Sequence, residues 1–222
     1  DLAISLGCRF SPQFVGHDYQ ALTNAKVISV DLEKDELNKR GQKIDIPLNY
    51  DLADFTPSFL IFLKNKKLKR FNQWNNLCSN FKKDYPIIYT KYNKKNKSKL
   101  MDLYYFMDRL GKNSSKKNIL ITDAGSNYYI GGQVWKFEKN QKELSSYTNA
   151  AMGLSIPLAI GAAVASPKST ILSVTGDGSL ELNIQELKTI SHYKFNIKLF
   201  VINDGGYVSM HNLSLIHISE PT

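Results

Sequence analysis

The sequence predicts an α/β protein with parallel sheets flanked by helices, and three observations support this fold class. Short apolar runs recur along the chain, each closed by Gly, Asp or Asn, which is typical of buried parallel strands. Segments with apolar residues at helical spacing separate several of these runs. Hydrophobic residues make up 42 % of the 222 residues, so the chain can bury a core and is not a disordered tail.

The first 63 residues are expected to form the second half of a doubly wound, Rossmann-like domain. A charged helical turn at 33–39 and an apolar helical stretch at 52–63 accompany three predicted strands, at 2–6, 26–31 and 44–48. The chain opens on Asp1 directly before the first strand, with neither an initiator Met nor a signal peptide. We therefore expect a fragment that is entered within a domain.

Residues 64–99 are expected to be a basic linker. The chain has 29 Lys and Arg against 20 Asp and Glu, a net charge of +9, and the excess gathers at 64–70, 94–99 and 112–117. Such clusters can neutralise the phosphates of nucleic acid. Here they are mixed with Asn and Ser, and no zinc-ligand spacing, RNA-binding aromatic signature or recognition-helix pattern accompanies them. We interpret them as solvated surface and expect no nucleic-acid partner, with nucleic-acid binding as the weaker alternative.

Cysteine content and hydropathy indicate the cellular compartment in which the protein is expected. Cys8 and Cys78 make neither a disulfide framework nor a metal cluster, which fits a reducing, cytoplasmic location. No apolar run reaches the roughly 18 residues that a membrane helix needs, so no membrane partner is expected.

Residues 100–212 are expected to form a second α/β domain. Strands are predicted at 118–122, 170–176 and 197–202, and helices at 100–110, 133–136, 150–165 and 180–193. The order strand, turn, helix, strand implies right-handed parallel crossovers. Residues 213–222 do not continue this pattern and are expected to be a non-native tail.

The turns that follow these three strands carry the candidate chemistry. In an open parallel sheet, ligands bind beyond the carboxyl ends of the strands. The backbone N–H groups of Gly178 and Ser179 suit a phosphate, and Asp177 lies at the same place. A carboxylate beside phosphate-binding amides favours a divalent cation between them, and Asn203 follows at the end of the next strand. Gly-Asp-Gly alone is also an ordinary turn, so the prediction of a magnesium-bridged diphosphate depends on this pairing.

These motifs resemble the cofactor motif of thiamine-diphosphate-dependent enzymes, in particular the acetolactate synthase large-subunit-like family. The residues that carry the resemblance are Gly176-Asp-Gly-Ser-Leu-Glu-Leu-Asn-Ile-Gln-Glu-Leu187 and Val201-Ile-Asn-Asp-Gly-Gly-Tyr207. Segments 118–125 and 145–162 resemble the family's diphosphate-binding domain, and 1–10 and 27–31 its central domain. The resemblance covers most of residues 1–63 and 118–212.

The resemblance implies a role for each matching residue. The side chains of Asp177 and Asn203 and the backbone carbonyl of Gly205 would bind Mg²⁺. Met152 would be the apolar wedge that bends the cofactor, although an isolated Met is more often a core residue, and the Ala150 carbonyl would accept the aminopyrimidine N–H. The full set implied for thiamine diphosphate is Gly125, Ser126, Asn127, Ala150, Met152, Gly176, Asp177, Gly178, Ser179, Asn203, Gly205 and Tyr207.

The implied activity is decarboxylation of a 2-oxo acid such as pyruvate with carboligation, in a homodimer or tetramer of branched-chain amino acid biosynthesis. Ser209 stands where acetolactate synthases usually carry Met, so a simple 2-oxo acid decarboxylase or a surface-sugar-pathway relative stays an alternative. A non-catalytic binding scaffold is the alternative of another class.

Two parts of the family's machinery are not matched by this sequence. The essential glutamate of the family belongs to an N-terminal pyrimidine-binding domain, so no catalytic residue is assigned here and this chain alone is expected to be inactive. Arg9 and Phe10 match the family's flavin pattern, but Ser11 and Gln13 replace the acidic and basic residues that should follow. This replacement leaves FAD binding in doubt.

Overall fold

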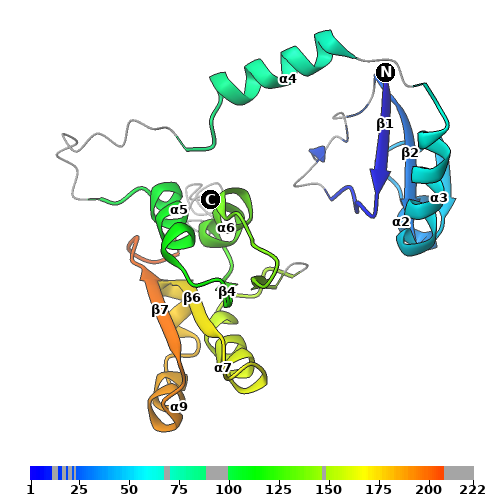
Figure 1. The fold of residues 1–222 in the computed structure, drawn as a ribbon. Coiled ribbons are helices and arrows are strands. Elements are labelled where there is room, and N and C mark those ends of the chain that lie inside the picture. The colour runs from blue at the N-terminus through cyan, green and yellow to red at the C-terminus, as the bar shows by residue number, and fades with distance from the viewer. Residues whose placement is uncertain are drawn as a thin grey trace, which may run out of the picture. The chain divides into compact units, whose positions relative to one another are not determined.

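The computed structural model describes residues 1–11, 15, 16, 19, 22, 24–67, 71–88, 100–146 and 149–207. The chain divides into two compact units, Asp1–Cys78 and Ser79–Thr222, and Figure 1 shows a parallel sheet in each. The predicted division at residues 63, 99 and 212 stays a prediction, and Gln13, Ser209 and the 213–222 tail lie outside the described residues.

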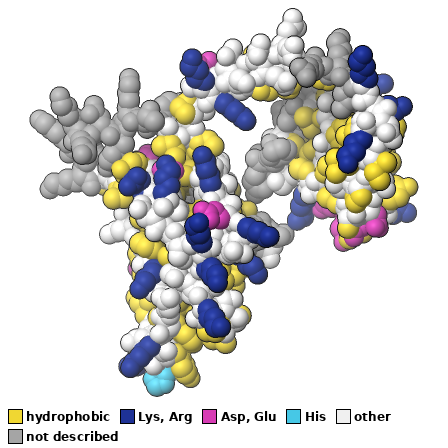
Figure 2. All heavy atoms as spheres, in the orientation of Figure 1, with side chains coloured by type: hydrophobic (Ala, Val, Ile, Leu, Met, Phe, Trp, Pro, Cys, Tyr) yellow, Lys and Arg dark blue, Asp and Glu magenta, His cyan; other side chains and the backbone are white. Residues whose placement is uncertain are grey.

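The surface of the described chain carries dispersed positive charge. Figure 2 shows Lys and Arg side chains over the visible face, most of them separated by uncharged side chains. Of the predicted basic clusters, 94–99 and the end of 64–70 lie outside the described residues. Cys8 and Cys78 are both free. Within the described ranges, no helix combines the length and the apolar character that spanning a membrane requires.

The first unit contains a three-stranded parallel sheet in the order β1-β2-β3. Its strands are β1 (Leu2–Leu6), β2 (Lys26–Asp31) and β3 (Ile46–Asn49), with α2 (Lys34–Asn38) before β3 and α3 (Leu52–Lys64) after it. The third strand begins two residues later than predicted. The reason is local, because the Asp45 carboxylate rather than a strand carbonyl accepts the Val27 N–H, at 2.8 Å. Beyond α3 lies α4 (Asn72–Asp84), which has no buried residue.

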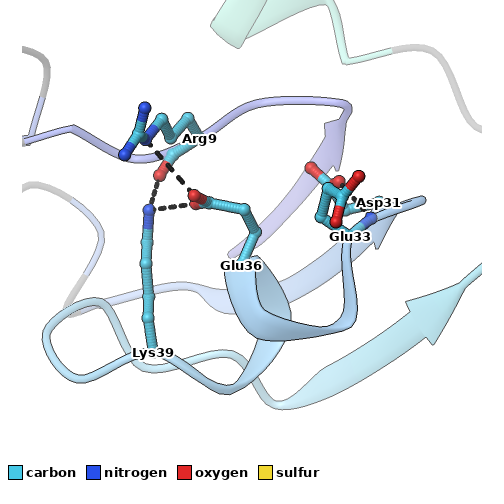
Figure 3. Close-up of polar contacts among 5 residues, drawn as sticks. All are labelled: Arg9, Asp31, Glu33, Glu36 and Lys39. Atoms are coloured by element: carbon cyan, nitrogen blue, oxygen red, sulfur yellow. Dashed lines mark hydrogen bonds and ion pairs between the residues drawn. The ribbon is translucent and has the colours of Figure 1, made fainter. Parts of the chain in front are cut away.

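Polar contacts tie the segment after β1 to α2 (Figure 3). The Arg9 guanidinium lies 3.2 Å from one Glu36 carboxylate oxygen, and Lys39 pairs with the other. The Lys39 ammonium also donates to the Arg9 carbonyl. At the end of β2, the Asp31 carboxylate accepts the Glu33 N–H at 2.9 Å. Arg9, the residue retained from the flavin pattern, is therefore engaged by a carboxylate of this chain.

The second unit contains a four-stranded parallel sheet in the order β5-β4-β6-β7. The predicted strands are found as β4 (Asn118–Thr122), β6 (Thr170–Gly176) and β7 (Ile197–Ile202). The strand that sequence reasoning missed is β5 (Lys142–Leu144), which pairs with β4 at one edge. Three residues, two of them charged, are too few to show a strand period.

The helices of this unit differ from the prediction at their ends. They are α5 (Leu103–Asn113), α6 (Ser126–Val134), α7 (Ser155–Ala165), α8 (Asp177–Glu181) and α9 (Glu186–Tyr193). The predicted helix at 150–165 begins only at Ser155, because Ala150 and Gly153 have positive φ angles of 47° and 77°. The prediction of one helix over 180–193 is wrong. A turn at 182–185 separates α8 from α9, and the Asn183 side chain there donates to the Gly153 carbonyl at 2.7 Å.

The predicted helix at 133–136 is wrong in position. Helix α6 begins eight residues after the start of β4, directly behind Gly125, whose φ is 95°. Its Gly131 allows a close approach, since a Cβ there would lie 3.2 Å from Thr122 Cγ2 and 3.4 Å from Met107 Cε. The sequence does not predict this helix because its glycines and tyrosines lower its helix propensity and interrupt the apolar residues at helical spacing.

The core of the second unit covers both faces of its sheet. All five residues of β4 are buried, and successive side chains point to opposite faces. On one face, Ile119, Ile121 and Ile171 pack against small residues of α7 such as Ala159. On the other face, Leu120, Leu172 and Val174 pack with Met107, Ile130, Val134 and Trp135, which come from α5, from α6 and from the residue after it. This two-sided packing holds the strand ends in a rigid frame.

Candidate functional site

A cavity of about 1030 Å³ opens at the carboxyl ends of β4, β6 and β7. The predicted cofactor residues line it with one exception, Gly205, whose neighbours Asp204 and Gly206 do line it. The part of the wall that the prediction did not name is mainly apolar and consists of Leu100, Met101, Leu103, Phe106, Leu199, Phe200, Val201 and Ile202, with Ala124, Tyr129 and Asp204. The cavity thus brings together residues that lie up to 107 positions apart, from Leu100 to Tyr207.

Asp177 joins the ends of β6 and β7. It is the first residue of α8, and its Oδ1 accepts the N–H of Gly178 at 2.9 Å. Its Oδ2 accepts the N–H groups of Gly205 and Gly206 at 3.1 and 2.9 Å. Both of these glycines have positive φ angles, 89° and 115°, which glycine adopts without steric cost. The predicted proximity of the two strand ends is therefore present in the structure.

Asn203 and Asp204 follow β7 at the cavity wall, and both are exposed. Partial desolvation raises the pKa of the Asp204 carboxyl, and the neighbouring Asp177 carboxylate raises this pKa further. Sequence reasoning passed over Asp204, although an acidic residue directly after a predicted metal ligand was a usable signal. The result is a locally negative corner on the wall of the cavity.

Tyr207 packs directly on the Gly178 turn. Its hydroxyl donates to the Gly178 carbonyl at 3.0 Å. A Cβ at position 178 would lie 2.6 Å from Tyr207 Cε1, so a glycine is required there unless the ring moves. Tyr207 therefore sits against the turn that was predicted to bind a diphosphate.

Other predicted residues line the cavity from the segment after β4 and the turn before α7. Ala150 is exposed and Met152 half-buried, and both line the cavity. Asn127 is 4 % exposed, and its side-chain amide donates to the Val174 carbonyl at 2.9 Å. That donor therefore links α6 to β6. Gly125 and Ser126, directly before it in the chain, also line the cavity.

The donor set fits a hard cation bound to a diphosphate. Mg²⁺ prefers oxygen ligands, and it is commonly held by one or two carboxylates together with substrate phosphates. Among the described residues there is no group of three His, Cys, Asp or Glu side chains suited to a metal. Asp177, an amide oxygen of Asn203 and a backbone carbonyl could form a different kind of set, in which the ligand supplies the remaining oxygens. The apolar wall is suited to an organic ring system.

Comparison with known proteins agrees with this geometry. Residues 123–219 match the family described as "Thiamine pyrophosphate enzyme, C-terminal TPP binding domain". This match runs into the segment 213–222 that was expected to be a non-native tail.

Relatives match over almost the whole chain. The acetolactate synthase large subunit of Cyanidium caldarium is 32 % identical over 207 residues, which cover 92 % of this chain and 34 % of that protein. The probable acetolactate synthase large subunit of Methanococcus aeolicus is 32 % identical over 215 residues, with 92 % and 35 % covered. The acetolactate synthase isozyme 1 large subunit of Escherichia coli (strain K12) is 28 % identical over 217 residues, which cover 98 % of this chain and 36 % of that protein.

The chain spans about a third of the length of the curated relatives that it matches. The family resemblance predicted from Gly176–Gly178 and Asn203 is thereby confirmed. Residues 123–219 match the C-terminal TPP-binding domain family of the thiamine pyrophosphate enzymes, and the chain is similar over most of its length to acetolactate synthase large subunits.

Proposed function

We propose that the cavity of the second unit binds the diphosphate of thiamine diphosphate through Mg²⁺. The whole protein would be an enzyme that decarboxylates a 2-oxo acid such as pyruvate and joins the product to a second 2-oxo acid. The observation that carries this proposal is the bridge from Asp177 to Gly205 and Gly206, which sets a carboxylate, the Asn203 amide and backbone amides on one cavity wall.

Asp177 keeps room for a cation in this arrangement. A carboxylate offers roughly four lone-pair positions, and three N–H donors occupy three of them. Oδ1 accepts one of these hydrogen bonds and Oδ2 the other two, so a cation would bind Asp177 on its Oδ1 side. The Asn203 side chain and the Gly205 carbonyl would complete the protein's share of the ligands, and Gly178 and Ser179 would hold the phosphate oxygens.

The apolar wall has a separate role. Leu103 and Phe106 from α5 and Met152 from the turn before α7 would exclude water and hold the rings of the cofactor in place. The thiazolium ring of bound thiamine diphosphate supplies the electron sink that decarboxylation of a 2-oxo acid requires. The Ala150 carbonyl would orient the aminopyrimidine by accepting its N–H. A glutamate outside this chain is the expected partner for proton transfer.

The relatives support carboligation as the outcome. They are named acetolactate synthase large subunits, so acetolactate is the proposed product and an assembly of subunits the proposed state. Assay of the full-length protein tests this with pyruvate. Acetolactate would support the proposal, whereas acetaldehyde would favour a simple decarboxylase, and cofactor binding without turnover of any 2-oxo acid would favour a scaffold.

Calorimetry tests the binding site itself. We expect Asp177→Ala and Asn203→Ala each to weaken thiamine diphosphate binding at fixed Mg²⁺ by tenfold or more, about 1.4 kcal/mol or more, because each removes one metal ligand. Asn113→Ala is the matched control, since it removes an exposed amide at the end of α5, about 15 Å along the helix from Leu103. Unchanged affinity in both site variants would contradict the proposal.

A further inference from the structure

Asp123 is a buried carboxyl group directly behind the cavity wall. It follows β4, is 1 % exposed and is absent from the cavity lining. Its Oδ1 accepts the N–H groups of Ala124 and Gly153 at 2.8 and 3.0 Å. Its Oδ2 accepts the Ser155 N–H and the Thr175 hydroxyl, both at 3.1 Å. All four partners are donors, which suits a carboxylate that accepts on both oxygens.

These hydrogen bonds connect the three segments that form the cavity. Gly153 and Ser155 lie at the start of α7 and follow Ala150 and Met152, which line the cavity. Thr175 comes two residues before Asp177, which lines the same cavity. A single buried side chain therefore holds the end of β4, the turn before α7 and the end of β6 at one separation.

The turn before α7 is held from its other side as well. The Gly153 carbonyl accepts the Asn183 side-chain N–H at 2.7 Å, so both backbone groups of Gly153 are used. Ala150 has a φ of 47°, which costs a residue with a Cβ conformational energy. Such a conformation persists only when the surrounding contacts enforce it. Asp123 supplies the contact between this turn and the sheet.

We propose that Asp123 is a positioning residue of the cofactor site. Its carboxylate holds the turn that carries Ala150 and Met152 at a fixed distance from the strand end that carries Asp177. This inference depends on the function proposed for the cavity, because it assigns Asp123 an effect on cofactor affinity. Asp123 does not touch the cofactor in this arrangement, and it acts only through the segments that do.

Asp123→Asn tests the proposal on the whole chain. Asn keeps the size and one acceptor oxygen, but it presents an NH₂ group to donors that now meet a carboxylate oxygen. We expect amide hydrogen exchange at Gly153 and Ser155 to be about ten- to a hundredfold faster without cofactor. We also expect the Kd for thiamine diphosphate with Mg²⁺ to rise at least tenfold. Exchange in the middle of β4, at Leu120 and Ile121, should stay unchanged.

A matched pair of hydroxyl deletions on β6 provides the second test. Thr175→Val removes one donor to Asp123 and keeps the shape of the side chain. Ser173→Ala removes a buried hydroxyl of the same strand that has no hydrogen-bond partner among the described residues. We expect Thr175→Val to weaken cofactor binding several-fold and Ser173→Ala to leave it unchanged. This pair decides the question if Asp123→Asn does not fold.

The outcomes separate this inference from the function on which it depends. If the unaltered full-length protein binds no thiamine diphosphate, the proposed function fails, and local exchange at Gly153 and Ser155 alone decides whether Asp123 holds the turn. If the unaltered chain binds and Asp123→Asn binds equally well, the positioning role is overturned. A uniform rise in exchange over the whole second unit would also overturn it, because Asp123 would then serve general stability.

Discussion

The two units use parallel sheets in different ways. In the second unit, β4 is buried over its whole length and side chains cover both faces of the sheet. In the first unit, Leu2, Ile4 and Leu6 of β1 lie on one face and are 60, 45 and 43 % exposed. Parallel sheets are normally covered on both faces. In the second unit, the strand ends of the sheet with a two-sided core hold a cavity and the candidate chemistry.

The largest expected effect comes from one pair of Leu→Ala changes in the two sheets. Leu120 is 0 % exposed, so Leu120→Ala should lower the free energy of unfolding by about 3 kcal/mol through lost burial and a cavity. Leu2→Ala in β1 should cost less than about 1 kcal/mol, since most of its side chain is already in water. Urea unfolding followed by circular dichroism measures both values. Equal losses of unfolding free energy for the two variants would contradict the proposed difference in burial between the two sheets.

A pair of Gly→Ala changes tests the difference between the two units at their strand ends. Gly153 has a φ of 77°, and a Cβ there would lie 2.8 Å from Leu182 Cβ and 3.2 Å from the Ser179 carbonyl oxygen. Gly7 in the first unit has a φ of 61°, but its Cβ would meet only Leu52 Cδ1, at 3.0 Å. We expect Gly153→Ala to cost about 2 kcal/mol and Gly7→Ala about 1 kcal/mol, because the Leu52 methyl can rotate away.

Thermal unfolding measures these two costs. The larger fall in Tm is expected for Gly153→Ala, together with weaker cofactor binding because the turn beside Met152 would shift. A larger fall in Tm for Gly7→Ala would contradict the account.

The smallest expected effects are opposite pH dependences in the two units. A hydrogen bond from the Val27 N–H, and then Lys43, lower the pKa of Asp45 below its ordinary 3.8. Its contribution to stability is present above pH 3.8 and is lost as the pH falls through the lowered pKa. Burial raises the pKa of Glu143 above its ordinary 4.5, against a hydrogen bond from Thr122. Its charged form therefore disfavours folding, increasingly so as the pH rises from 4.5 through the raised pKa.

Two amide variants test these signs by unfolding at several pH values. Asp45→Asn should lower stability at pH 7, with the difference vanishing in strong acid. Glu143→Gln should raise stability at pH 7, with the difference vanishing below pH 4.5, since Gln keeps an acceptor for Thr122 and carries no charge. The same sign for both variants at pH 7 would show that one of the two causes is wrong.

Short-range patterns in the sequence predicted the fold class, most strands and the proximity of Asp177 to the turn after β7. Apolar runs such as Ile119–Ile121 and Ile197–Ile202 specify buried strands locally, because their period and their closing turns are short-range signals. The rule that parallel strands end at one edge then placed Asp177 beside the Asn203–Tyr207 turn. That prediction needed no knowledge of packing, only the order of strand, helix and strand.

The other features depend on contacts between residues that lie far apart in the sequence. Whether 180–193 is one helix depends on Asn183, whose partner Gly153 is 30 residues away, and Asp123 reaches Gly153, Ser155 and Thr175 at separations of 30, 32 and 52. The strand β5 forms because its backbone pairs with the edge of β4. Hydrogen bonds between residues that are distant in the sequence produce no periodic pattern in that sequence. Each of them depends on how whole helices and strands pack in the folded protein.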